Sequence, residues 1–303
     1  MAATIPAQAV ALSHPGLVVR AWANRGIAQL DSGQLVPFHF PRRLTRPLPG
    51  DRVILDNKDS LVEVIDRHNE FGRGDARGRF KPTAANIDLA IIVIAPRPAP
   101  SPDLIHRYIT GALLQQIEPV IVVNKADLPI PSTRVFEDLQ ELSSIGYRII
   151  HTRCKPEPDL GDLSHLLNQG TSLLTGQSGV GKTSLLNAIV PDLDEQTGAL
   201  SHVTGKGTHT TTTATVYPLS ASSAIVDTPG VWEYSLWSMP ADELQRGFPE
   251  FAPFASKCRF RNCRHDSEPG CAVRAAAESS EIPASRHAAW LRLLKEQDRL
   301  ERG

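Results

Sequence analysis

The sequence contains no apolar run near the roughly 18 residues that a membrane-spanning helix requires, so we expect no transmembrane segment. Its first residues, MAATIPAQAVALSHPG, lack the basic start of a secretory signal and are expected to form a frayed tail. These two absences favour a cytoplasmic protein with no membrane partner.

Cysteine is scarce, and four cysteines are too few to form a disulfide scaffold in 303 residues. Three of them, Cys258, Cys263 and Cys271, fall within 14 residues, which indicates metal binding in a reducing compartment. Cys154 stands apart and is expected to be a buried or half-buried thiol.

Neither sign of charge dominates, since the net charge is −1, but the distribution is uneven. Residues 1–85 carry 12 basic and 8 acidic side chains, residues 86–249 carry 10 and 17, and residues 250–303 carry 10 and 8. Basic ends around an acidic middle would suit a polyanionic partner, and an ordinary solvated surface is the alternative.

Short β-rich runs occupy the first part of the chain. Five such runs within about 50 residues, separated by turn residues, predict a small barrel of the OB or SH3-like type. The runs span residues 17–23, 26–30, 34–40, 51–55 and 60–65. The following stretch, FGRGDARGRFKPT (71–83), is rich in Gly and Arg and is predicted to be a mobile basic linker or loop.

From residue 86 the pattern becomes that of an α/β domain. Continuous apolar runs predict strands that are buried on both faces of a mainly parallel sheet, with helices between them. The predicted strands are 89–95, 119–125, 147–151, 171–175 and 223–228, and the predicted helices are 102–117, 133–145, 160–168 and 182–190. After about residue 240 only helices are predicted, at 272–279 and 283–301.

Residues 176–183, GQSGVGKT, match the phosphate-binding loop G-x-x-x-x-G-K-[ST] between a predicted strand and a predicted helix. The glycines allow backbone N–H groups to curl around a phosphate at a helix N-terminus. We expect Lys182 to reach the β- and γ-phosphates and Thr183 to place its hydroxyl on Mg²⁺. A chance glycine-rich turn is the alternative.

Two further motifs end predicted strands. Asn124-Lys125-Ala126-Asp127 fits the guanine-reading N-K-x-D element, in which the Asp127 carboxylate would accept the two donors of guanine, which adenine lacks. Asp227-Thr228-Pro229-Gly230 fits D-x-x-G, in which Asp227 would hold the Mg²⁺ shell through water and the Gly230 amide would sense the γ-phosphate. Each motif alone would also fit a surface turn.

The order of these motifs is informative, because N-K-A-D precedes the phosphate loop, which precedes D-T-P-G. In Ras-like GTPases the phosphate loop comes first and N-K-x-D follows D-x-x-G. The sequence therefore predicts a circularly permuted P-loop GTPase that binds GTP and GDP. The expected nucleotide-binding residues are Asn124, Lys125, Ala126, Asp127, Gly176, Gln177, Ser178, Gly179, Val180, Gly181, Lys182, Thr183, Ser184, Asp227 and Gly230.

The catalytic groups are less usual. Val231 stands where many GTPases have a water-positioning Gln, and a valine cannot orient water. The Gly/Thr-rich stretch 204–213 predicts a flexible switch loop in which Thr210 or Thr211 contacts Mg²⁺. His209 in the same stretch is the nearest residue able to orient water. The expected catalytic residues are His209, Lys182 and Thr211.

The C-terminal cysteines belong to the pattern C-x4-C-x-H-x5-C, formed by Cys258, Cys263, His265 and Cys271. Four N and S ligands in a short span predict one structural Zn²⁺ in a closed tetrahedral site, which would stabilise a module too small for its own core. Unrelated free thiols are the alternative. Nearby basic side chains, among them Arg259, Arg261 and Arg264, suit contact with phosphates.

Over roughly residues 17–300 the chain resembles the RsgA (YjeQ-type) small-ribosomal-subunit-dependent GTPases. The resemblance is carried by Gly50 to Val53, Ala85 to Asp88, N-K-A-D, the phosphate loop, a G-x-H-T-T-T-like switch, D-T-P-G and the Cys/His pattern. It implies an OB fold, a permuted GTPase domain and a zinc domain. It also implies late maturation of the small ribosomal subunit, with hydrolysis stimulated by that subunit, and a hydrolytic role for His209.

The sequence thus predicts a multidomain α/β protein. Residues 1–83 are expected to form a tail, an OB-like β-barrel and a linker, residues 84–247 the permuted GTPase domain, and residues 248–303 an α-helical zinc-binding domain. The expected partner of this monomer is the small ribosomal subunit and its rRNA. The alternative function is a GTP-dependent protein-binding switch without an RNA role.

Overall fold

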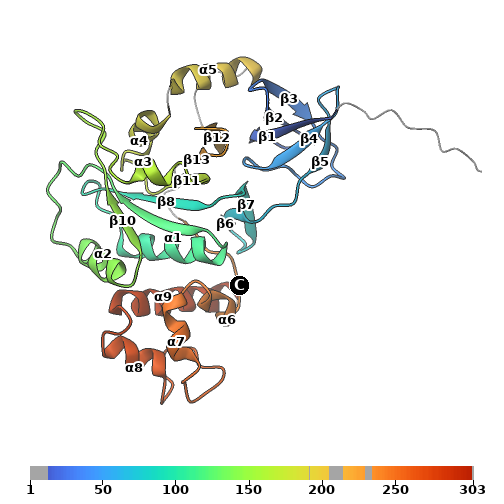
Figure 1. The fold of residues 1–303 in the computed structure, drawn as a ribbon. Helices are drawn as coiled ribbons and strands as arrows, with labels where there is room; N and C mark the ends of the chain where they lie inside the picture. The colour runs from blue at the N-terminus through green and yellow to red at the C-terminus, as the bar shows by residue number, and fades with distance from the viewer. Residues whose placement is uncertain (1–12, 191, 205–213, 229–233, 302–303) are drawn as a thin grey trace, which may run out of the picture.

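The computed structural model describes residues 13–190, 192–204, 214–228 and 234–301 (Figure 1). The barrel-like N-terminal sheet packs beside a larger central sheet, and the C-terminal helices lie below that sheet in the view of Figure 1. In the described part of the chain, no helix combines the length and the apolar character needed to cross a membrane.

The N-terminal sheet has five antiparallel strands in the order β3-β2-β1-β4-β5. An isolated parallel bridge between His39 and Ser60 brings its two edges together. Val18, Phe38 and Val53 are fully buried inside, and in β3 the buried Val36 and Phe38 alternate with exposed residues. The strands are β1 (His14–Ala21), β2 (Arg25–Leu30), β3 (Leu35–His39), β4 (Arg52–Leu55) and β5 (Leu61–Val64).

The prediction of a mobile linker or loop at 71–83 is wrong, because this stretch forms a packed hairpin. Its strands are β6 (Glu70–Gly74) and β7 (Phe80–Ala85). Phe71 is buried and stacks on Tyr234, with ring centroids 5.9 Å apart. A Cβ at Gly74 would lie 2.4 Å from the Leu236 carbonyl oxygen, so the glycine serves close packing rather than flexibility.

The central sheet has six strands in the order β10-β9-β8-β11-β13-β12, all parallel except β12. The predicted apolar runs are confirmed as strands, whereas β12 was not predicted. The strands are β8 (Leu89–Ile94), β9 (Glu118–Val123), β10 (Arg148–His151), β11 (Thr171–Thr175), β12 (Thr215–Pro218) and β13 (Ala224–Asp227).

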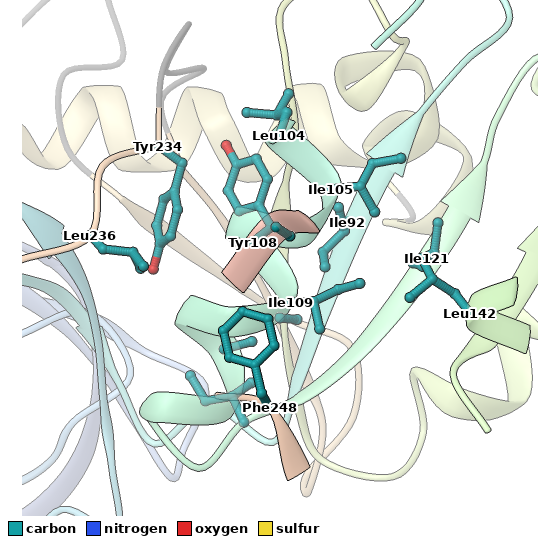
Figure 2. Close-up of a cluster of buried hydrophobic side chains, with 14 of the residues drawn as sticks. Ile92, Leu104, Ile105, Tyr108, Ile109, Ile121, Leu142, Tyr234, Leu236 and Phe248 are labelled. Carbon is teal, nitrogen blue, oxygen red and sulfur yellow. The ribbon is translucent and has the colours of Figure 1, made fainter. Parts of the chain in front are cut away.

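Helices cover both faces of this sheet, as the central strand β8 shows. Ile92 and Ile94 join one hydrophobic cluster with α1 and α2, while Ile91 and Val93 join the other with α3 and α4. Figure 2 shows Ile92 in the first cluster with side chains of α1. The helices are α1 (Pro102–Leu114), α2 (Arg134–Ser144), α3 (Leu163–Leu166), α4 (Lys182–Ile189) and α5 (Leu193–Thr204), the last of which was not predicted.

The C-terminal part packs on α1 through its last helix, and its described residues contain no strand, as expected. Trp290 and Leu293 are buried in the cluster that includes α1. Arg286 is fully buried and pairs with Glu250. The elements are α6 (Ala241–Gln245), the 3-10 helix η1 (Pro249–Phe251), α7 (Ala252–Ala255), α8 (Ala272–Glu278) and α9 (Ala284–Leu300).

Candidate functional site

The phosphate loop lies between β11 and α4, as its motif requires. Gly176 has φ +134° and Gly181 has φ +97°, both in the region that favours glycine. A Cβ at Gly176 would lie 2.2 Å from the Val93 carbonyl oxygen, and one at Gly181 would lie 2.4 Å from Asn124 Nδ2. The two glycines therefore allow the loop to turn tightly against the neighbouring strands.

Lys182 folds back over this loop. Its Nζ donates hydrogen bonds to the carbonyl oxygens of Gly176 and Gln177, both at 2.7 Å. Burial lowers the pKa of Lys182, and the Asp227 carboxylate partly opposes this effect. A phosphate in the loop would offer the ammonium charged acceptors, which are stronger than carbonyls.

Asn124 ties the N-K-A-D segment to the phosphate loop. Its Nδ2 donates to the Val180 carbonyl oxygen at 3.0 Å, and its side chain is buried. Lys125 Nζ donates to the carbonyl oxygens of Gly179 at 2.7 Å and Arg97 at 2.8 Å. Two motifs that are about 50 residues apart in sequence thus form one site, while the Asp127 side chain stays exposed.

Asp227 ends β13, which pairs in parallel with β11, and its register partner is Leu174. The carboxylate therefore lies beside the strand that leads into the phosphate loop. Burial raises the pKa of Asp227 to about 6, although the charges of Lys182 and Arg20 oppose the rise. A buried carboxylate whose negative charge is only partly balanced by nearby cationic side chains is well suited to bind a metal cation.

Thr183 and Ser184 lie in the first turn of α4, where the Thr183 side chain is exposed. His209, Thr210, Thr211, Gly230 and Val231 lie outside the described residues.

The sequence motifs do not point clearly to the segment after β10, which contacts Asn124 in the structure. Thr152 Oγ1 donates to Asn124 Oδ1 at 3.2 Å, and Cys154 Sγ lies 3.6 Å from the same oxygen. The Ala126 N–H donates to the Thr152 carbonyl oxygen at 3.0 Å. The position of this segment could have indicated its role. It follows β10, which is a parallel neighbour of β9, and the carboxyl ends of parallel strands meet at one edge of the sheet.

The second candidate site is the C-terminal cysteine–histidine cluster. The ligand atoms of Cys258, Cys263, His265 and Cys271 all lie within 4.8 Å of one another. His265 Nδ1 lies 3.6 Å from Cys258 Sγ and 3.5 Å from Cys271 Sγ, while its Nε2 lies 3.1 Å from Gln245 Oε1. The three thiols and the Nδ1 atom form a donor set that fits a tetrahedral Zn²⁺.

The phosphate loop, N-K-A-D and Asp227 converge on one edge of a mainly parallel sheet, in the chain order 124, 176, 227. This arrangement defines a circularly permuted P-loop GTPase. The family model described as RsgA GTPase matches residues 64–237, and the chain belongs to this family. It is therefore a GTP-hydrolysing enzyme.

Known relatives agree with this assignment. The chain is 44% identical, over 256 residues, to the small ribosomal subunit biogenesis GTPase RsgA of Chromohalobacter salexigens, covering 82% of this chain and 74% of that protein. The crystal structure of YjeQ from Thermotoga maritima matches with a TM-score of 0.74 and 28% identity, covering 94% of this chain and 99% of that one. YloQ, described as a circularly permuted GTPase, matches with a TM-score of 0.69 and 25% identity over 98% of both chains.

Proposed function

We propose that this enzyme binds the small ribosomal subunit and hydrolyses GTP to GDP and phosphate during late maturation of that subunit. The observation that carries the proposal is the match, over 82% of the chain, to a protein named as a small ribosomal subunit biogenesis GTPase. The candidate site supports it, because the motifs for phosphate and for guanine lie side by side in the fold.

Within that site, residues 176–184 would hold the phosphates and residues 124–127 the base. The exposed Asp127 carboxylate would accept the two guanine donors, and Lys182 would shift from its carbonyl acceptors to phosphate oxygens. Thr183 would bind Mg²⁺ directly and Asp227 through water. The ion supplies positive charge that neutralises the transferring phosphoryl group.

For the hydrolytic step we propose that His209 orients the attacking water, because Val231 has no group that can do so. Lys182 would stabilise charge on the phosphates, and Thr211 would complete the Mg²⁺ shell. Gly230 would contact the γ-phosphate through its amide. Phosphoryl transfer depends mainly on positioning and charge stabilisation, which these groups can supply.

We propose that Cys258, Cys263, His265 and Cys271 hold one structural Zn²⁺. His265 would bind through Nδ1, which faces the sulfurs, and donate its Nε2 hydrogen to Gln245 Oε1. Such a partner fixes the tautomer and orientation of a ligating histidine.

We also propose that the N-terminal sheet is an OB barrel. The support is the pairing of β1 with both β2 and β4, together with the parallel bridge between His39 and Ser60. OB barrels commonly bind nucleic acid, which fits rRNA as the partner. The proposed domains are 1–83, 84–247 and 248–303, and β7 joins the first two because it crosses their boundary.

Co-sedimentation with purified small ribosomal subunits at several salt concentrations tests this function. We expect nucleotide-dependent binding that weakens as salt rises, because phosphate contacts release counterions. The alternative, a GTP-dependent protein-binding switch, predicts no binding to the subunit. We propose that the chain acts as a cytoplasmic monomer, so light scattering of the free protein should give the mass of one chain.

A further inference from the structure

A cavity of about 360 Å³ lies where three parts of the molecule meet. Its walls come from the end of β1 and the segment before β4, from the β6–β7 hairpin, and from the carboxyl ends of β11 and β13. Thr175 directly precedes the phosphate loop and Thr228 directly follows Asp227. The cavity thus adjoins the candidate GTP site but is formed by other residues.

The walls of this cavity are largely aromatic and apolar. Trp22, Phe71 and Tyr234 line it together with proline residues. Arg25 lies 5.7 Å from the centroid of the Trp22 ring. Of the three rings, Trp22 is half-buried, whereas Phe71 and Tyr234 are buried and stack on each other. An aromatic ring in the wall of an apolar cavity is typical of sites for flat heterocycles.

Three cations line the same cavity, namely Arg46, Arg73 and Lys81. Within the described ranges, none of the three has an ion-pair partner, and no carboxylate lines the cavity. Uncompensated positive charge from two different segments therefore converges on one hollow. An anion with several acceptor oxygens, such as a phosphate, matches this charge.

One wall of the cavity is held in place by buried hydrogen bonds. Tyr234 donates its hydroxyl hydrogen to the Gly72 carbonyl oxygen at 3.0 Å, and Gln115 Nε2 donates to the Tyr234 hydroxyl at 3.0 Å. The Tyr234 ring also stacks on Tyr108, with centroids 4.6 Å apart, and Figure 2 shows the two rings side by side. A preformed wall lowers the entropy lost on binding.

We propose that this cavity binds one nucleoside monophosphate unit in addition to the GTP site, with the base against Trp22 and the edges of Phe71 and Tyr234, and the phosphate on Arg73 and Lys81. The unit comes either from free nucleotide or from one unpaired residue of a single-stranded RNA. The proposal does not depend on the ribosomal role, because it rests on the walls and charges of the cavity alone.

The experiment uses the full chain with its GTP site filled by excess GDP and Mg²⁺. AMP and a short oligoadenylate are titrated separately, and binding is followed by calorimetry and by tryptophan fluorescence. Arg73→Glu should weaken binding of the accepted probe at least ~10-fold, since a charge-assisted phosphate contact is lost. Trp22→Phe should abolish the fluorescence change.

Arg77→Glu is the matched control, because Arg77 is exposed in the turn of the same hairpin and does not line the cavity. It should change affinity less than about two-fold at physiological salt. The proposal is supported if probe binding is weakened in Arg73→Glu but not in Arg77→Glu. If the wild type binds the oligoadenylate but not AMP, the bound unit belongs to RNA.

The proposal is overturned if neither probe saturates the wild-type protein. It is also overturned if both charge reversals have equal effects, or if the fluorescence change survives in Trp22→Phe. Retained GDP binding shows that each variant is folded. Co-sedimentation of the same variants with small subunits tests the proposed function separately. If the wild type binds subunits but binds neither probe, the proposed function stands and the cavity proposal fails.

Discussion

Asn124 connects the three segments that form the candidate nucleotide site. It contacts the phosphate loop through Val180 and the segment after β10 through Thr152, and it is buried. Asp127, three residues later, is exposed instead. The N-K-A-D motif thus combines one residue that fixes the loops with one that is free to meet a base.

The role of Asp127 can be tested by replacing its carboxylate with an amide. Asp127→Asn should weaken GTP and GDP binding by about 10²-fold, because two guanine donors lose a charged acceptor. It should favour xanthine nucleotides, whose base offers an acceptor at that position. The measurement is a titration of each nucleotide, and unchanged GDP affinity would remove N-K-A-D from the site.

His106 supplies a pH dependence of stability. It lies on α1, is buried, and sits 3.6 Å from Asp138 on α2, with Arg134 bonded to the same carboxylate. Burial lowers the pKa of His106 below its usual 6.5, an effect that Arg286 and Arg292 reinforce and that Asp138 opposes. The native state therefore favours neutral histidine, and stability is lost as the pH falls through 6.5, where the unfolded chain takes up a proton first.

We expect His106→Gln to reduce this loss. Urea unfolding of wild type and variant at pH 7 and pH 5.5, with zinc content verified, measures the difference. The free energy of unfolding should fall more in the wild type than in the variant between pH 7 and pH 5.5. An equal or smaller fall in the wild type would show that His106 is protonated in the native state.

His209 is the residue proposed to orient the attacking water. His209→Ala should keep GTP affinity within a few-fold and leave subunit binding intact. It should reduce subunit-stimulated turnover by about 10²-fold or more, the usual scale for a positioned proton-transfer group. Equal single-turnover rates in wild type and variant would mean that another group orients the water.

At the scale of elements, sequence periodicity identified the strands that are buried on both faces. The runs at 89–95 and 171–175 became β8 and β11 because continuous apolar sequence fits a covered parallel sheet. The β6–β7 hairpin was missed because Gly72 and Gly74 fit both a loop and a strand in close contact. Gly74 is required because Leu236 packs closely against it. Leu236 is about 160 residues away in sequence, so the local sequence around Gly74 gives no sign of this contact.

The helix α5 and the strand β12 were missed for a similar reason. Helix α5 contains Gly198 and two threonines, which are weak helix formers, and it packs against β3 of the N-terminal sheet. Strand β12 is short and ends in Pro218, and it lies against β1, where Arg20 Nε donates to Thr215 Oγ1 at 2.8 Å. Contacts with the N-terminal sheet and, for β12, antiparallel pairing with β13 hold these elements in place of local preference.

The C-terminal module gives a test of the metal assignment. Cys263→Ser should lose the zinc and loosen residues 250–275, because the module would lose one of four ligands, while GDP binding largely survives. Metal analysis and limited proteolysis measure both effects. Cys154→Ser, which removes the cysteine outside the cluster, should keep one zinc per chain. Protein purified without chelator that holds no zinc would contradict the assignment.

At the scale of the whole molecule, the N-terminal sheet and the C-terminal helices both pack on elements of the part of the chain that holds the candidate nucleotide site. The N-terminal sheet contacts β12 through β1, and the C-terminal helix α9 packs on α1. Ion pairs such as Arg107–Glu296 and Arg292–Asp103 reinforce the second contact. The N-terminal sheet therefore touches the central sheet directly, and the C-terminal helices touch it through α1.

Single-turnover GTP hydrolysis, with and without saturating small ribosomal subunits, tests the central claim most directly. The free enzyme should turn over slowly, since Val231 offers no group to orient water. Purified subunits should accelerate hydrolysis on the order of 10²-fold, the scale of a positioned catalytic group, with the effect declining as salt rises. Hydrolysis at the same rate with and without subunits would contradict the account.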